Sequence, residues 1–156
     1  MCVVASLYEW LLFLHVIAVM IWVGGVIVLA SLAVFVLRNG DSAGIGGFVG
    51  MLRVVGPIVL APAPAIALGV GIWMVVDSDA WAFDQEWIYI ALALLAAAFV
   101  YGAAFQSRAA IAAARASASG DGAEAARQLR RWSLGSGLIL LLLVIATWDM
   151  VFKPGV

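Results

Sequence analysis

The stretch LYEWLLFLHVIAVMIWVGGVIVLASLAVFVL, residues 7–37, decides the fold. It holds one acidic residue, Glu9, near its start, and the only histidine of the protein, His15. At about 1.5 Å of rise per residue it is longer than the ~30 Å hydrocarbon core of a bilayer. The stretch therefore predicts a transmembrane helix with room to tilt.

One face of this predicted helix carries a polar group. Residues at alternating spacings of three and four share a helical face. Here that face holds Tyr8, Leu11, His15, Ala18, Trp22, Gly25, Leu29 and Leu32. A titratable side chain is costly in lipid, so we expect His15 to face the inside of a bundle walled by three further helices.

The composition predicts an integral membrane protein. Hydrophobic residues make up 67% of the 156 residues, charged residues make up 11%, and the mean hydropathy is +1.17. Soluble domains carry about 25% charged residues. We therefore expect an all-α, four-helix transmembrane bundle in one domain, residues 1–156, with the lipid bilayer as its main contact. The sequence contains no basic patch with interleaved aromatic residues, so we expect no nucleic-acid partner.

Apolar runs place the four spans at about residues 7–37, 54–76, 87–117 and 134–152, the third including an extension beyond the membrane. The glycine-rich segment 42–53 lacks the Lys-Ser/Thr ending of a phosphate-binding loop, and we interpret it as a flexible connector. Pro57, Pro62 and Pro64 predict a kink or a broken turn in the second span. We expect Asp84 to be the N-cap of the third span. Asp121 followed by Glu124 predicts a capping box for a short helix leading into the fourth.

Basic residues predict the orientation of the bundle. Seven of the eight flank the first and third loops: Arg38, Arg53, Arg108, Arg115, Arg127, Arg130 and Arg131. The positive-inside rule then places these loops in the cytoplasm and both termini outside it. We expect a multi-pass protein of the cell membrane.

Several motifs resemble a known family. LHVIAVMIWVGG (14–25), MLRVVGPIVLAPAPAIALGVGIW (51–73), a tryptophan at the head of the third span and VFKPG (151–155) are similar to an uncharacterised family of four-helix predicted integral membrane proteins. That family is related to the CopD copper-resistance membrane proteins and to HemJ-type membrane protoporphyrinogen oxidases, which bind haem b. The specific part of the resemblance is His15, Trp22, Gly24, Arg53, Pro62, Trp87, Lys153 and Pro154.

The sequence departs from the oxidases at two places. Ala91 stands where they have a lysine, and Leu134-Gly135-Ser136-Gly137 stands where they have an Asn-Glu pair. The resemblance therefore implies their fold and a haem site on His15, but not their activity, and we expect no porphyrinogen oxidation. The spans hold no nucleophile–base pair and no paired carboxylates, which argues against hydrolytic chemistry.

A haem site is the most specific functional hypothesis. Neutral imidazole is a standard axial ligand, and four-helix cores hold cofactors between facing helices. We expect haem b to be ligated by His15 and bounded by Gly69 and Gly71 of the second span, with Trp22 and Gly25 along its inner edge. The second axial ligand is then a methionine, a water, or His15 of a second protomer in a homodimer or larger complex.

Two other hypotheses stay open. A copper-handling protein would use Cys2, His15, Met74 and Met150, because soft ligands suit Cu(I). A cofactor-free membrane subunit or scaffold would use His15 only to bond a backbone carbonyl or a Ser/Thr of a neighbouring helix.

The arginine distribution predicts that Cys2 is extracytoplasmic. An impermeant maleimide added to intact cells should label Cys2, because no membrane separates it from the reagent. Protection in cells together with labelling in inverted vesicles would reverse the predicted orientation.

Overall fold

The protein is a bundle of long helices, and residues 6–39 and 42–155, which this computed structural model describes, contain no strand. Its α-helices are α1 (Leu7–Asn39), α2 (Ser42–Val55), α3 (Pro62–Asp77), α4 (Glu86–Tyr101), α5 (Ser107–Ala118) and α6 (Gly122–Phe152). Two π-helical segments of five residues, η1 (Gly56–Leu60) and η2 (Gly102–Gln106), join α2 to α3 and α4 to α5. The predicted all-α class is confirmed.

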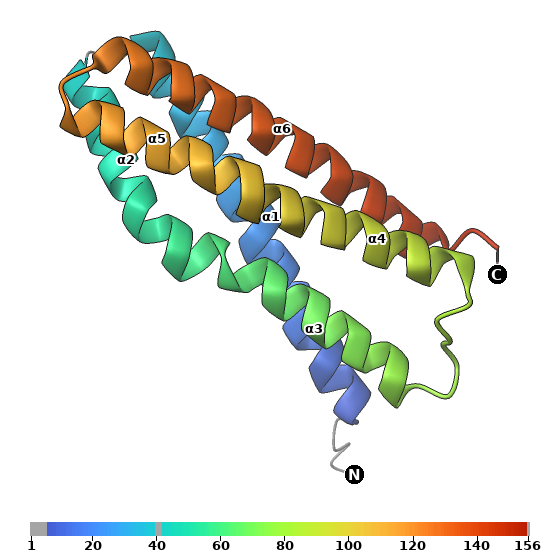
Figure 1. Cartoon of the computed structure of the whole chain (residues 1–156). Coiled ribbons are helices and arrows are strands. Elements are labelled where there is room, and N and C mark those ends of the chain that lie inside the picture. Colours follow the sequence, from blue (N-terminus) through green and yellow to red (C-terminus); the bar gives the residue numbers. More distant parts are fainter. Residues whose placement is uncertain (1–5, 40–41, 156) are drawn as a thin grey trace.

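Four continuous helical stretches in the described residues are long and apolar enough to cross a membrane: Leu7–Asn39, Ser42–Asp77, Glu86–Ala118 and Gly122–Phe152. Helix α1 packs against α3 and α6, α6 also packs against α4 and α5, and α2 packs against α5 (Figure 1). The start of α1, the end of α6 and the 78–85 connection form one end of the bundle, called here the terminal end. The end of α1, the start of α2 and the 119–121 turn form the other, called the arginine-rich end.

The buried face of α1 follows the expected face over its first half and then diverges from it. Its buried residues are Leu11, Ala18, Trp22, Val26, Leu29 and Ala33. Leu32, expected on this face, is 38% exposed, while Ala33 is fully buried. The expected set advanced by about 3.5 residues per turn, whereas a straight helix advances by 3.6, so the two faces separate towards the C-terminal end of α1.

The interpretation of residues 42–53 as a flexible connector is wrong. They lie in α2, so the second helical stretch begins at Ser42 rather than near residue 54. An added Cβ at Gly46 would lie 3.1 Å from Ser117 Oγ of α5, so this glycine lets two helices approach closely. Packing of this small-residue kind, together with the burial of Phe48 and Leu52, outweighs the low helix propensity of glycine.

The predicted break in the second span is confirmed. Pro57 lies in η1, and the chain passes through a turn at Ala61 before α3 starts at Pro62. The amide of Ala61 bonds the carbonyl of Gly56 at 2.9 Å, a spacing of five residues. Proline lacks a backbone N–H and crowds the preceding turn, which explains why the α-helical hydrogen-bond pattern is replaced here by a π-helical one.

The third span begins almost where predicted, but its cap differs. Gln85, not Asp84, occupies the N-cap position of α4, and it makes no side-chain capping bond. The amides of Ile88 and Tyr89 bond the backbone carbonyl of Gln85, and its own amide bonds the carbonyl of Ala82. A backbone turn thus supplies the start of α4, and the expected carboxylate cap is not used.

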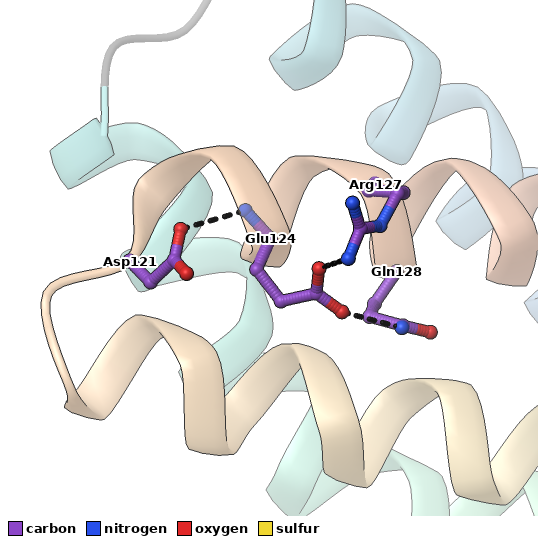
Figure 2. A network of polar contacts seen from close by, with 4 residues as sticks. All are labelled: Asp121, Glu124, Arg127 and Gln128. Atoms are coloured by element: carbon purple, nitrogen blue, oxygen red, sulfur yellow. Dashed lines mark hydrogen bonds and ion pairs between the residues drawn. The ribbon is translucent and has the colours of Figure 1, made fainter.

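The turn between α5 and α6 confirms half of the predicted capping box (Figure 2). Asp121 Oδ1 accepts a hydrogen bond from the amide of Glu124 at 2.9 Å. Glu124 does not return the bond; its carboxylate pairs with Arg127 and accepts from Gln128 Nε2 at 2.6 Å. The helix that starts here is not short, because α6 runs without a break to Phe152.

The interior consists of two apolar clusters stacked along the bundle. The cluster nearer the arginine-rich end includes Phe48, Leu129 and Trp132, with the Phe48 and Trp132 rings meeting edge to face at 6.2 Å between centroids. The other includes Trp22 and Ile139. Large apolar side chains also cover the outside, as expected for a surface in contact with lipid.

Replacing Leu129 should destabilise the bundle much more than replacing an outward-facing leucine of the same helix. Leu129 is 0% exposed and Leu134 is 73% exposed. Leu129→Ala leaves a cavity and should cost about 2–5 kcal/mol of unfolding free energy, whereas Leu134→Ala should cost under about 0.5 kcal/mol. Denaturant unfolding in detergent measures both; equal losses would contradict the assigned packing of α6.

Candidate functional site

His15 joins α1 to α3 through a hydrogen bond. The chain places it in the middle of an apolar run, where α1 lies against α3, and its side chain is half-buried. Its Nδ1 lies 2.9 Å from the backbone carbonyl oxygen of Ala67, a buried residue of α3. A carbonyl oxygen can only accept, so Nδ1 carries a proton and donates, and in the neutral imidazole Nε2 then keeps its lone pair. This bond fixes both the ring position and the tautomer.

The two glycines expected beside His15 lie on different sides of α3. A Cβ added at Gly71 would lie 3.2 Å from His15 Cε1 and 3.3 Å from Nδ1, so the imidazole packs directly on this glycine. A Cβ added at Gly69 would meet nothing within 4 Å, and Gly69 is exposed. The structure therefore brings Gly71, but not Gly69, to the histidine. Close packing of ring against helix accounts for Gly71.

Trp22 and Gly25 lie further along α1, away from the imidazole. Trp22 is 4% exposed and belongs to the interior cluster with Ile139. A Cβ added at Gly25 would lie 3.1 Å from Leu60 Cδ2 in η1. These residues pack α1 against the π-helical part of the second span, and they lie about 10 Å (Trp22) and about 15 Å (Gly25) from His15 along the helix.

Aromatic and polar side chains gather at the terminal end of the bundle. Trp81 Nε1 donates to Tyr8 Oη at 3.2 Å, and its ring meets that of Trp87 edge to face at 5.1 Å. Lys153 Nζ lies 4.1 Å from the ring centroid of Trp81 and 5.3 Å from that of Trp87. Cation–π contact thus links the VFKPG segment to the head of α4. Asp149, one turn before Lys153, is 2% exposed, and its Oδ2 has no hydrogen-bond partner among the described residues.

Comparison with known proteins agrees with this architecture. A family described as predicted integral membrane protein (DUF2269) matches residues 9–154. The chain belongs to this family. No curated protein matches significantly, and no solved structure does. The match and the four candidate spans together make the chain a multi-pass integral membrane protein.

Metal-ligating side chains are sparse in this DUF2269 protein. Residues 6–39 and 42–155 contain no group of three or more His, Cys, Asp or Glu side chains placed to hold a metal ion. Cys2, named as a copper ligand, lies outside the described residues. Met74 and Met150 are half-buried, and Met150 packs on the apolar cluster that contains Trp22. Copper handling stays a prediction.

Sequence reasoning missed a second polar position within the candidate spans, Gln106. It is 9% exposed and lies in η2, where its Nε2 donates to Trp132 O at 3.4 Å and to Ser136 Oγ at 2.5 Å. The available signal was a lone carboxamide at the end of an alanine-rich apolar run.

The glycine contacts of this DUF2269 protein predict different effects on stability for two matched variants. Gly71→Leu places a side chain where the imidazole lies and should cost about 1–3 kcal/mol of unfolding free energy. In Gly69→Leu the new side chain would point into open space, so the unfolding free energy should stay nearly unchanged. Denaturant unfolding of both variants in detergent checks this. Equal stability of the two would mean that the ring does not pack on Gly71.

Proposed function

We propose that this protein binds haem b within the membrane, with Nε2 of His15 as an axial ligand. The observation that carries the proposal is the hydrogen bond from Nδ1 to the carbonyl of Ala67. Histidines that ligate a metal commonly donate their other N–H to a backbone carbonyl or carboxylate, which fixes the tautomer and raises the basicity of the ligating nitrogen. The ring of His15 has that second partner in place.

The surroundings of the ring also suit an apolar cofactor. His15 is half-buried, so the α1–α3 contact covers one part of the ring and leaves another part accessible. Its Nδ1 and Cε1 edge is occupied by Ala67 and Gly71, so a ligated iron would have to approach from the Nε2 side. The neighbours of His15 along α1 are apolar, including the exposed Leu12 and Val16. Bound haem would supply one-electron chemistry, and the protein would supply the ligand and its orientation.

The proposal includes an arrangement in the membrane. The chain has one histidine, so a second imidazole ligand would have to come from His15 of a second copy, in a homodimer. The cytoplasmic side would be the arginine-rich end, because seven of the eight basic residues lie in the segments that flank its loops. His15 would then lie nearer the extracytoplasmic surface. This layout resembles that of the HemJ-type oxidases without their charged positions.

A cofactor-free membrane subunit is the second candidate, and the same hydrogen bond favours it. A histidine that only holds two helices together would bond a neighbouring backbone carbonyl, as His15 does. The two functions differ in their requirement for Nε2. A helix-joining role needs only the Nδ1 bond, whereas a ligand role also needs the free lone pair.

Purification from haem-replete cells tests the proposal. The wild-type protein in detergent should show a Soret band, and His15→Ala should lose it. Added imidazole should restore the band by replacing the missing ligand. Met51→Leu, a change in α2 distant in sequence from His15 and conservative in size, should keep full haem content.

Two results would contradict haem ligation by His15. One is a wild-type protein that carries no haem after such expression. The other is a His15→Ala variant that keeps its haem while losing stability, which would assign the residue to helix joining alone. Denaturant unfolding of the same samples distinguishes a variant that has lost only the axial ligand from one that has lost its folded structure.

A further inference from the structure

A cavity of about 420 Å³ lies where the second and third spans both pass through a π-helical segment. It is lined from η1 by Gly56, Pro57 and Leu60, and from η2 by Gly102 and Gln106. Its volume falls in the range of about 300–1,000 Å³ found for small-molecule sites. π-Helical turns inside α-helices are frequent at functional sites, and here two of them line the same space. His15 is not among the lining residues, so the cavity is distinct from the haem site proposed above.

One end of the cavity is polar and the other apolar. The second span advances from Arg53 to Pro64 by eleven residues, about 16 Å, and the antiparallel third span returns from Ala98 to Ser107. Arg53, Gln106 and Ser107 therefore lie towards the arginine-rich end. Trp22, Pro64 and Ala98 line the opposite end without any charge. An occupant that matches this cavity has a polar head and an apolar tail.

Gln106 supplies an unused acceptor in this cavity. Its Nε2 faces Trp132 O, which can only accept, and Ser136 Oγ, whose own proton goes to Trp132 O at 3.0 Å. These partners fix the carboxamide with its nitrogen towards α6. Within the described part of the chain, Gln106 Oε1 accepts no hydrogen bond, although the side chain is more than nine-tenths buried. Gln106 lines the cavity, so this acceptor is available there to a donor such as a hydroxyl group.

Arg53 supplies a cation at the same end. It lies in the last turn of α2, is exposed, and makes no ion pair with any described residue. Pro57, Ala103 and Ser107 are also exposed, so the cavity opens sideways between the second and third spans. In a membrane that opening faces lipid. Guanidinium groups bind phosphate by paired, charge-assisted hydrogen bonds.

We propose that this cavity holds one acyl chain of an anionic glycerophospholipid whose head group carries free hydroxyls. The phosphate binds Arg53, a head-group hydroxyl donates to Gln106 Oε1, and the acyl chain extends towards Pro64 and Ala98. The head then lies towards the arginine-rich end, as it would for a lipid of the leaflet on that side. This assignment does not depend on haem binding.

Native mass spectrometry of the full chain with added lipids tests the assignment. Three probes share their acyl chains: phosphatidylglycerol, phosphatidylmethanol, which is anionic but lacks the hydroxyls, and zwitterionic phosphatidylcholine. Phosphatidylglycerol should bind most tightly, phosphatidylmethanol less tightly, and phosphatidylcholine least. Equal binding of the first and third would overturn the role of Arg53, and equal binding of the first two would overturn that of Gln106.

Matched variants locate the bound lipid. Arg53→Gln should weaken phosphatidylglycerol binding about tenfold, the loss expected for one charged hydrogen bond, whereas Arg130→Gln should not. Ala103→Trp should block the lateral opening, while Ala97→Trp adds the same bulk to an exposed position outside the cavity lining. All four positions are exposed, so folding should survive each change. Equal binding by the two tryptophan variants would place the lipid elsewhere.

Discussion

The absence of water in the hydrocarbon core is the constraint on which this structure depends. Every polar group placed there needs a partner inside the protein, and helices satisfy the backbone by themselves. Several polar side chains follow the same rule. His15 donates to a carbonyl of α3, Ser136 to one of α6, and Thr147 to the carbonyl of Leu143 at 2.8 Å. Each bond either joins two helices or is accepted by a carbonyl of the same helix.

Polar groups that break this rule are the informative ones. Gln106 Oε1 accepts no bond within the described residues, and Asp149 Oδ2 and Trp87 Nε1 are buried without partners there. Leaving a buried atom such as Asp149 Oδ2 or Trp87 Nε1 unpaired costs about 1–3 kcal/mol, which an apolar residue in the same place would not incur. At Gln106 a cavity adjoins the unpaired atom and offers room for the missing donor. Asp149 and Trp87 do not line that cavity.

Most of the fold could be predicted from the sequence, because the hydropathy and length of a helix depend only on the residues of that helix. The four spans, the proline break and the Asp121 cap each depend on residues close together in the chain. The local sequence of glycine-rich α2 does not predict a helix, because this helix depends on close packing against α5, which no local pattern encodes. For the same reason the sequence suggested His15 and Gly71 as neighbours but could not exclude Gly69. The helical rise gives the depth of each residue along the helix axis. The direction in which a residue faces around that axis depends on how α1 and α3 pack against each other.

His15 and the cavity lie at different depths but share two helices. Along α1, seven residues, about 10 Å, separate His15 from Trp22, which lines the apolar end of the cavity. Along α3, Ala67 supplies the carbonyl that holds His15, and Pro64, one turn earlier, lines the same apolar end. The first two turns of α3 therefore belong to both sites. Helix α3 continues from α2 through the π-helical segment η1, and it packs along α1. The His15–Ala67 bond is part of that packing, so the polar contact that orients the imidazole also keeps in place the helix that closes the cavity.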